Sequence, residues 1–146
     1  MPRLEQGTGI GPIQNRQQYE KVKGFLDTAR RDGTIIAGGQ VMDGDGYFIR
    51  PTIVRDVTDG HAIVDQEQFG PILPVIRFED VEDVIARANA SEYGLGGSVW
   101  SKDVARATDL AGRIESGQVW VNQHIGIGPH IPMAEYTQLQ VINVAR

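Results

Sequence analysis

The sequence predicts an α/β fold with a mostly parallel sheet, about three helices and a final strand. Strand-like and helix-like segments alternate along the second half of the chain, and the helix-like segments place apolar residues every three or four positions. Such alternation is typical of parallel strands joined by right-handed crossovers. The 146 residues, 40% of them hydrophobic, are expected to form a single domain over residues 1–146.

The first helix is predicted over residues 15–31, after a Gly-rich lead at residues 1–12 that is expected to be flexible. Asn15 is a suitable N-cap, and Gly33 is suited to end the helix. The apolar stripe expected to face the core consists of Tyr19, Val22, Leu26 and Ala29. The β-favouring residues 34–37 then predict a short strand.

Turns and broken strands are predicted next. The Asp-Gly-Asp-Gly stretch at residues 43–46 favours a turn, since it lacks the further acidic ligand and the distal Glu of a calcium loop. Residues 47–49 and 52–54 flank Pro51 and suit an edge or broken strand, because proline has no N–H to donate. The dense apolar run at residues 72–78 predicts a strand covered on both faces.

A second helix is predicted from Asp80, a suitable N-cap, to about Ala90, with Asp83 in its first turn. The stripe expected to face the core consists of Val81, Val84, Ile85 and Ala88. Residues 98–100 predict the strand that follows.

A third helix is predicted between Ser101, as its N-cap, and Gly117, which ends it. Its expected inward face consists of Val104, Ala107, Ala111 and Ile114. A strand follows at residues 119–121, and both Trp100 and Trp120 are expected in the core, where large rings fill space between sheet and helices. Residues 136–144 alternate polar and apolar side chains, which predicts a half-buried terminal strand.

Composition excludes several classes of partner. The net charge is −5 and no basic cluster occurs, so nucleic acid is not an expected partner. No apolar run approaches the roughly 18 residues needed to cross a bilayer, and residues 1–9 lack the apolar segment of a secretory signal, so no membrane contact and a cytoplasmic location are expected. His124 and His130 lie in a Gly/Pro loop without the ligands that would complete a metal site, and His61 lies in a charged turn with no nucleophile to activate.

Six motifs in series occur in a familiar order. They are GPIQN at residues 11–15, GYFIRPTIV at 46–54, EQFGP at 67–71, ANASEYGLGGSVWS at 88–101, ESGQVWVN at 115–122 and EYTQLQV at 135–141. Together they resemble the C-terminal part of the NAD(P)-dependent aldehyde dehydrogenase superfamily, which comprises the distal half of the catalytic domain and a terminal oligomerisation strand. The resemblance places that strand at residues 135–145. Between Pro132 and Glu135 the family usually has a segment beginning Phe-Gly-Gly, whereas this sequence has only two residues, which looks like an internal deletion.

The resemblance implies a cofactor-binding role for four residues. Glu67 matches the Glu that binds the nicotinamide ribose hydroxyls, and Phe69 matches the ring packed beside the nicotinamide. Gln18 and Lys21 fall near positions that approach the same ribose. The residues alone leave structural alternatives open: a solvated loop carboxylate at Glu67, a core ring at Phe69, and solvent-facing side chains at Gln18 and Lys21. Residues 122–133 match the loop that lines the aldehyde entrance.

The chain contains no cysteine, and the family reaction begins with a cysteine thiolate. No Ser or Lys has a partner arrangement that would replace it, so no catalytic residue is predicted and the chain alone is expected to be inactive, with no firmly bound NAD or NADP. Three classes remain open: a folded remnant that self-associates, a weak nucleotide- or aldehyde-binding module, and a fragment that complements a separately encoded portion. The resemblance favours a homodimer formed through the terminal strand.

Overall fold

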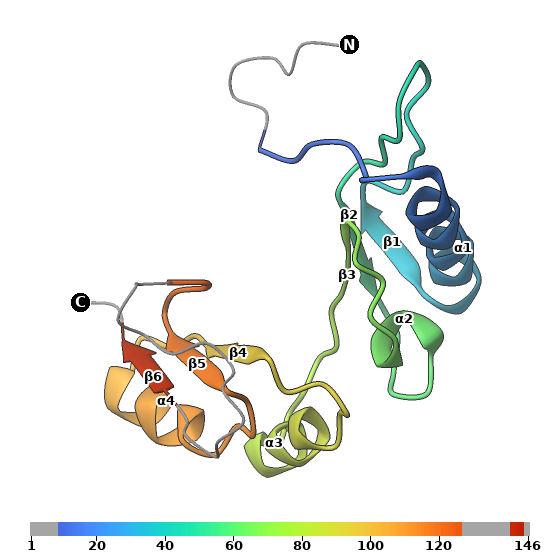
Figure 1. Ribbon diagram of the computed structural model, residues 1–146. Helices are drawn as coiled ribbons and strands as arrows, with labels where there is room; N and C mark the ends of the chain where they lie inside the picture. The colour runs from blue at the N-terminus through green and yellow to red at the C-terminus, as the bar shows by residue number, and fades with distance from the viewer. Residues whose placement is uncertain (1–8, 127–140, 145–146) are drawn as a thin grey trace. The chain divides into compact units, whose positions relative to one another are not determined.

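Two compact units divide the chain, one at residues 1–77 and the other at residues 78–146. The computed structural model describes residues 9–126 and 141–144, the last four by their backbone only (Figure 1). The single-domain boundaries stay a prediction. Among the described residues, no helix is both long and apolar enough to cross a membrane.

The first unit is built on α1, Arg16–Asp32, which confirms the first predicted helix. The Asn15 side chain caps it by accepting a hydrogen bond from the Gln18 backbone N–H at 2.9 Å, and Gly33 follows its last residue. The buried face of α1 consists of Val22, Phe25, Leu26 and Ala29. This stripe forms one side of the core of the unit.

A three-stranded sheet forms the other side of that core (Figure 1). Its strands are β1, Thr34–Ala37; β2, Thr52–Arg55; and β3, Ile72–Pro74. The central strand β2 pairs antiparallel with β1 and parallel with β3. The short helix α2, Ala62–Asp65, lies between β2 and β3 in sequence and places Ile63 in the core.

This unit differs from the predictions in three places. Residues 52–54 lie in the central strand and not at an edge, which Pro51 permits because it lies just before the strand. The alternative of a broken strand is confirmed, because Ile49, before Pro51, forms only an isolated bridge with Val41. The apolar run at 72–78 supplies only a three-residue strand, and Leu73 in it is 60% exposed, so that strand is not covered on both faces. The single-turn α2 was not predicted, because one turn is too short to show helical periodicity.

The second unit contains a fully parallel sheet in the order β4-β5-β6. Its strands are β4, Gly96–Val99; β5, Gln118–Val121; and β6, Val141–Val144. The helix α3, Val81–Asn89, begins at Asp80, whose side chain accepts from the Glu82 N–H, as predicted. The helix α4, Val104–Ala111, packs Ala107 and Ala111 against Val119 and Val121.

Several details of this unit differ from the predictions. The N-cap of α4 is Asp103, while Ser101 accepts a hydrogen bond from the Asp103 N–H, and the helix ends at Gly112 rather than Gly117. Trp120 is buried at 6% exposure, as predicted, but Trp100 follows β4 and is 63% exposed. Val104, expected to face inward, is also exposed. Of the predicted terminal strand, residues 135–140 and 145 lie outside the described residues.

Candidate functional site

The candidate site is formed by α1 and the loop at residues 66–71, which joins α2 to β3. Gln18 and Lys21 are three residues apart and lie on the same face of α1. The loop carries Glu67 and Phe69, and hydrogen bonds link it to both helix residues. The structure therefore brings together all four residues that the sequence predicted as cofactor-binding.

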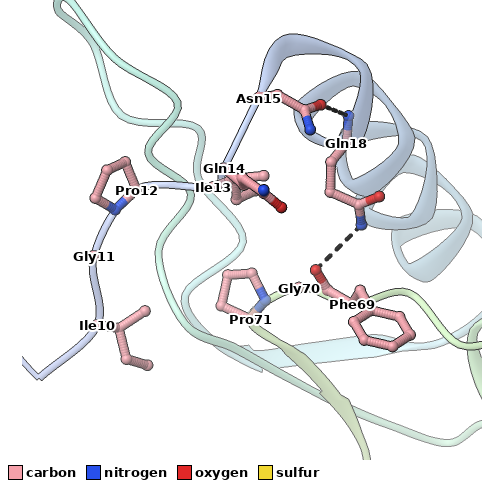
Figure 2. A pocket seen from close by; sticks show the side chains of 10 residues that line it. All are labelled: Ile10, Gly11, Pro12, Ile13, Gln14, Asn15, Gln18, Phe69, Gly70 and Pro71. Atoms are coloured by element: carbon pink, nitrogen blue, oxygen red, sulfur yellow. Dashed lines mark hydrogen bonds between the residues drawn. The ribbon is translucent and has the colours of Figure 1, made fainter.

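Both helix side chains hold the backbone of the loop. Gln18 Nε2 donates to the carbonyl oxygen of Gln68 at 2.6 Å and to that of Phe69 at 3.1 Å (Figure 2 shows the second bond). Lys21 Nζ donates to the Glu67 carbonyl oxygen at 3.1 Å. Three consecutive carbonyls thus accept hydrogen bonds from one helix. The solvent-facing interpretation is wrong for Gln18, which is half-buried, whereas Lys21 stays exposed while it holds the loop.

The loop has a constrained backbone. Phe69 has a φ of +45°, a left-handed conformation that costs a residue other than glycine about 1–3 kcal/mol. Next to it, Gly70 lies so close to α1 that an added Cβ would be 2.6 Å from Cγ2 of Val22. The Ile72 N–H donates to the Gly70 carbonyl at 2.8 Å, and the Gln68 side chain donates to the Ile72 carbonyl. These contacts fix the loop along its whole length.

The two residues at the tip of the loop face solvent. Phe69 is 76% exposed, so the expectation that its ring lies in the core is wrong. The Glu67 side chain is exposed too, and among the described residues no hydrogen bond to its carboxylate is found. An anionic acceptor and an aromatic ring two residues apart are therefore available to a ligand.

A cavity of about 540 Å³ lies beside the loop. Its walls are the lead segment from Ile10 to Asn15, the side of Gln18 and residues 69–71 (Figure 2). The lead segment is tied to the unit by the Ile13 N–H, which donates to the Tyr47 carbonyl at 2.8 Å. Part of the predicted flexible lead thus lines this cavity, and residues 1–8 lie outside the described residues.

Comparison with known proteins decides the family. The sequence model of the aldehyde dehydrogenase family matches residues 1–135 of this chain. The chain belongs to this family. It is 42% identical over 125 residues to betaine aldehyde dehydrogenase of Rhizobium leguminosarum bv. trifolii, covering 83% of this chain and 26% of that protein. It is 37% identical over 130 residues to the mitochondrial aldehyde dehydrogenase of Homo sapiens, covering 88% of this chain and 25% of that protein.

Solved aldehyde dehydrogenases share the fold. The NAD+ complex of the Bacillus cereus enzyme matches with a TM-score of 0.84 and 36% identity, covering 92% of this chain and 28% of that one. The chain therefore spans about a quarter of the length of the relatives that it matches. These matches confirm both the α/β fold class and the resemblance on which the site residues were predicted.

The family implies a nicotinamide dinucleotide, and the loop residues fit part of one. An ionised Glu67 can accept from two vicinal ribose hydroxyls, and the exposed Phe69 ring offers an edge to a flat heterocycle. Lys21 uses one of its three N–H donors on the loop, so two remain for a ligand. Gln18 is different, because both N–H donors of its amide point at loop carbonyls and only its oxygen is left.

Residues 122–133, predicted from the resemblance to line an aldehyde entrance, begin at a pair of hydrogen bonds between Asn122 and Ser101, called here the Asn122 clamp, which the sequence did not predict. Asn122 has a φ of +55°; its amide accepts from the Ser101 N–H and donates to the Ser101 carbonyl, each at 2.8 Å. Past it, Trp120 Nε1 donates to the Gly126 carbonyl at 3.2 Å. The feature of the sequence that could have indicated these hydrogen bonds is the amide side chain at the end of the strand predicted over residues 119–121. Residues 127–133 lie outside the described residues.

Ionisable groups elsewhere have structural partners. The Arg113 guanidinium donates to the Glu82 carboxylate, one bond measuring 2.9 Å, and joins α3 to the turn after α4. These bonds hold the pKa of Glu82 below its ordinary range. His61 Nδ1 accepts from the Thr58 N–H at 3.4 Å, and the His124 ring packs edge-on against Trp120. Within the part of the chain that the structure describes, no group of three or more His, Asp or Glu side chains could hold a metal.

Proposed function

We propose that this chain contributes the nicotinamide-ribose contact of an NAD(P)-dependent aldehyde oxidation site. The observation that carries the proposal is the exposed Glu67 and Phe69 pair on a loop whose three consecutive carbonyls are held by α1. Glu67 accepts hydrogen bonds from the ribose hydroxyls, and Phe69 limits the rotation of the adjacent ring. A nicotinamide held there would supply the acceptor for the hydride that aldehyde oxidation releases.

The same proposal assigns no chemical step to this chain alone. Aldehyde oxidation to an acid needs a nucleophile on the carbonyl carbon before hydride leaves, and a thiolate serves this purpose in the family. The sequence has no cysteine to supply that thiolate. The nucleophile must come from other residues, either further along a longer polypeptide or on a second chain.

Binding of NAD or NADP to the purified chain tests the ribose contact. In a titration followed by NMR, Glu67→Gln should weaken binding about fivefold to tenfold, because a charge-assisted hydrogen bond becomes a neutral one. Glu92→Gln, at another exposed Glu, is the matched control and should bind like the wild type. Equal affinities for wild type and Glu67→Gln would refute the assignment of Glu67, and no response to millimolar NAD or NADP would refute cofactor contact by this chain.

Catalysis is tested separately. The chain alone should give no aldehyde-dependent rise in reduced nicotinamide, whereas co-expression with an N-terminal aldehyde dehydrogenase portion should restore it. A substrate-derived adduct on the pure chain, detected by intact mass, would contradict the absence of a nucleophile.

Self-association is also part of this proposal. Large apolar side chains are exposed in both units, including Leu73, Leu95 and Trp100, and exposed apolar surface of this kind favours burial against another copy. A homodimer that includes the terminal strand is the simplest arrangement. Light scattering at micromolar concentration should report twice the chain mass of 16.0 kDa, and a monomer there would remove this part of the proposal.

A further inference from the structure

The hydrogen bonds of the Gln18 side chain indicate a role other than direct binding of a ligand. A primary amide carries two N–H donors on one nitrogen. Gln18 Nε2 lies 2.6 Å from the Gln68 carbonyl oxygen and 3.1 Å from that of Phe69, so both donors are directed at the loop. The residue can therefore act on a ligand chiefly through the loop, and not by donating to it.

These hydrogen bonds hold the part of the loop whose backbone conformation is least favourable by itself. Phe69 has a φ of +45°, which a bulky aromatic residue rarely adopts. Its ring is 76% exposed, so burial of the ring does not stabilise the conformation. Lys21 holds the carbonyl of Glu67, two residues earlier, and Gly70 packs on Val22 one residue later. Gln18 is the side chain that bonds the carbonyl of Phe69 itself (Figure 2).

We propose that Gln18 is a positioning residue that holds Phe69 in its left-handed conformation and so sets the direction of the phenyl ring relative to the Glu67 carboxylate. Only the identity of the ligand, a nicotinamide dinucleotide, rests on the proposed function. Without the amide donors, Phe69 relaxes to a negative φ, and the ring no longer lies where the loop now presents it.

The conformational part is tested without ligand, by NMR on the isotope-labelled chain. Backbone chemical shifts and the amide-to-Hα coupling of Phe69 report its φ. Gln18→Met keeps the length of the side chain without donors, Gln18→Ala removes it, and both residues favour helices. Gln17→Ala, the same residue type one position earlier on the exposed surface of α1, is the matched control.

The left-handed signature of Phe69 should be present in the wild type and in Gln17→Ala and lost in both Gln18 variants. Its persistence in either Gln18 variant would overturn the proposal. Loss of the α1 circular dichroism signal in both Gln18 variants would also count against it, because Gln18 would then support the helix and not the loop.

A double-mutant cycle with NAD as the probe tests how the effect reaches the ligand. Gln18→Met and Phe69→Ala should each weaken binding about threefold to tenfold, and the double variant should bind no more weakly than Phe69→Ala alone. Additive losses would overturn the positioning role, since Gln18 would then contact the ligand directly. A wild type that does not respond to NAD would refute the proposed function, while the φ of Phe69 would still decide the role of Gln18.

Discussion

Gly70→Ala should disturb the candidate site through a single methyl group. An ideal Cβ at this position would lie 2.6 Å from Cγ2 and 2.9 Å from Cγ1 of Val22, which is fully buried in the core face of α1. Carbon atoms at van der Waals contact are about 3.5–4.0 Å apart, so the loop or the helix must shift by about 1 Å. Overpacking of this size costs about 1–3 kcal/mol. Urea unfolding followed by circular dichroism should show that loss.

The assignment of this cost to Val22 is checked by a second variant. Val22→Ala removes the two methyl groups that the new Cβ would meet and is destabilising by itself, because it leaves a cavity. Together, the two substitutions should cost less than the sum of their separate effects, by about 1–2 kcal/mol. Strictly additive losses would refute the steric explanation.

A glycine on α1 provides the matched control. A Cβ at Gly24 would meet nothing within 4 Å, and the residue lies in the helix interior. Gly24→Ala should therefore raise the free energy of unfolding by about 0.5–1 kcal/mol, opposite in sign to Gly70→Ala. A loss of stability in Gly24→Ala would contradict the open space beside Gly24.

Two further predictions concern the second unit. Asn122→Ala removes both hydrogen bonds to Ser101 and should lower the free energy of unfolding by about 1–3 kcal/mol, whereas Gln123→Ala should change it little; equal effects would contradict the clamp. The Arg113 hydrogen bonds lower the pKa of Glu82 from its ordinary value of 4.5, so the stabilisation is present above that value and is lost as pH falls through the lowered pKa. The difference in urea midpoint between wild type and Glu82→Gln should therefore be constant above the ordinary pKa and shrink as pH falls below it, and a difference that stays constant on acidification would contradict this role of the Arg113–Glu82 pair.

Local chemistry explains where the sequence predicted elements well. Asn15 and Asp80 precede amphipathic stretches, and both cap their helices as expected, because an N-cap needs only a short polar side chain and the next two or three residues. The alternation of strands and helices after residue 78 likewise gave the parallel order of β4 and β5, because a helix between two strands returns the chain to the same end of the sheet.

Distant contacts explain the errors. Ser101 and Asp103 are both suitable N-caps, and the bonds between Ser101 and Asn122, 21 residues later, hold Ser101 beside the end of β5 instead. Trp100 and Trp120 both follow strand-like residues, yet only Trp120 lies over Gly96 of the neighbouring strand, where the missing side chain leaves room for the ring. Burial of a ring depends on its neighbour across the sheet, which a local pattern does not contain.

For the candidate site, the sequence by itself determined the family and the absence of cysteine, and it predicted the four residues, because motif order and composition are properties of the chain alone. The tertiary structure decided which hydrogen bonds connect those residues. Gln18 and Phe69 are 51 positions apart, and only the packing of α1 against the loop brings the amide to the carbonyls. Hydrogen bonds act over about 3 Å, so their partners are fixed by the fold and not by spacing in the sequence.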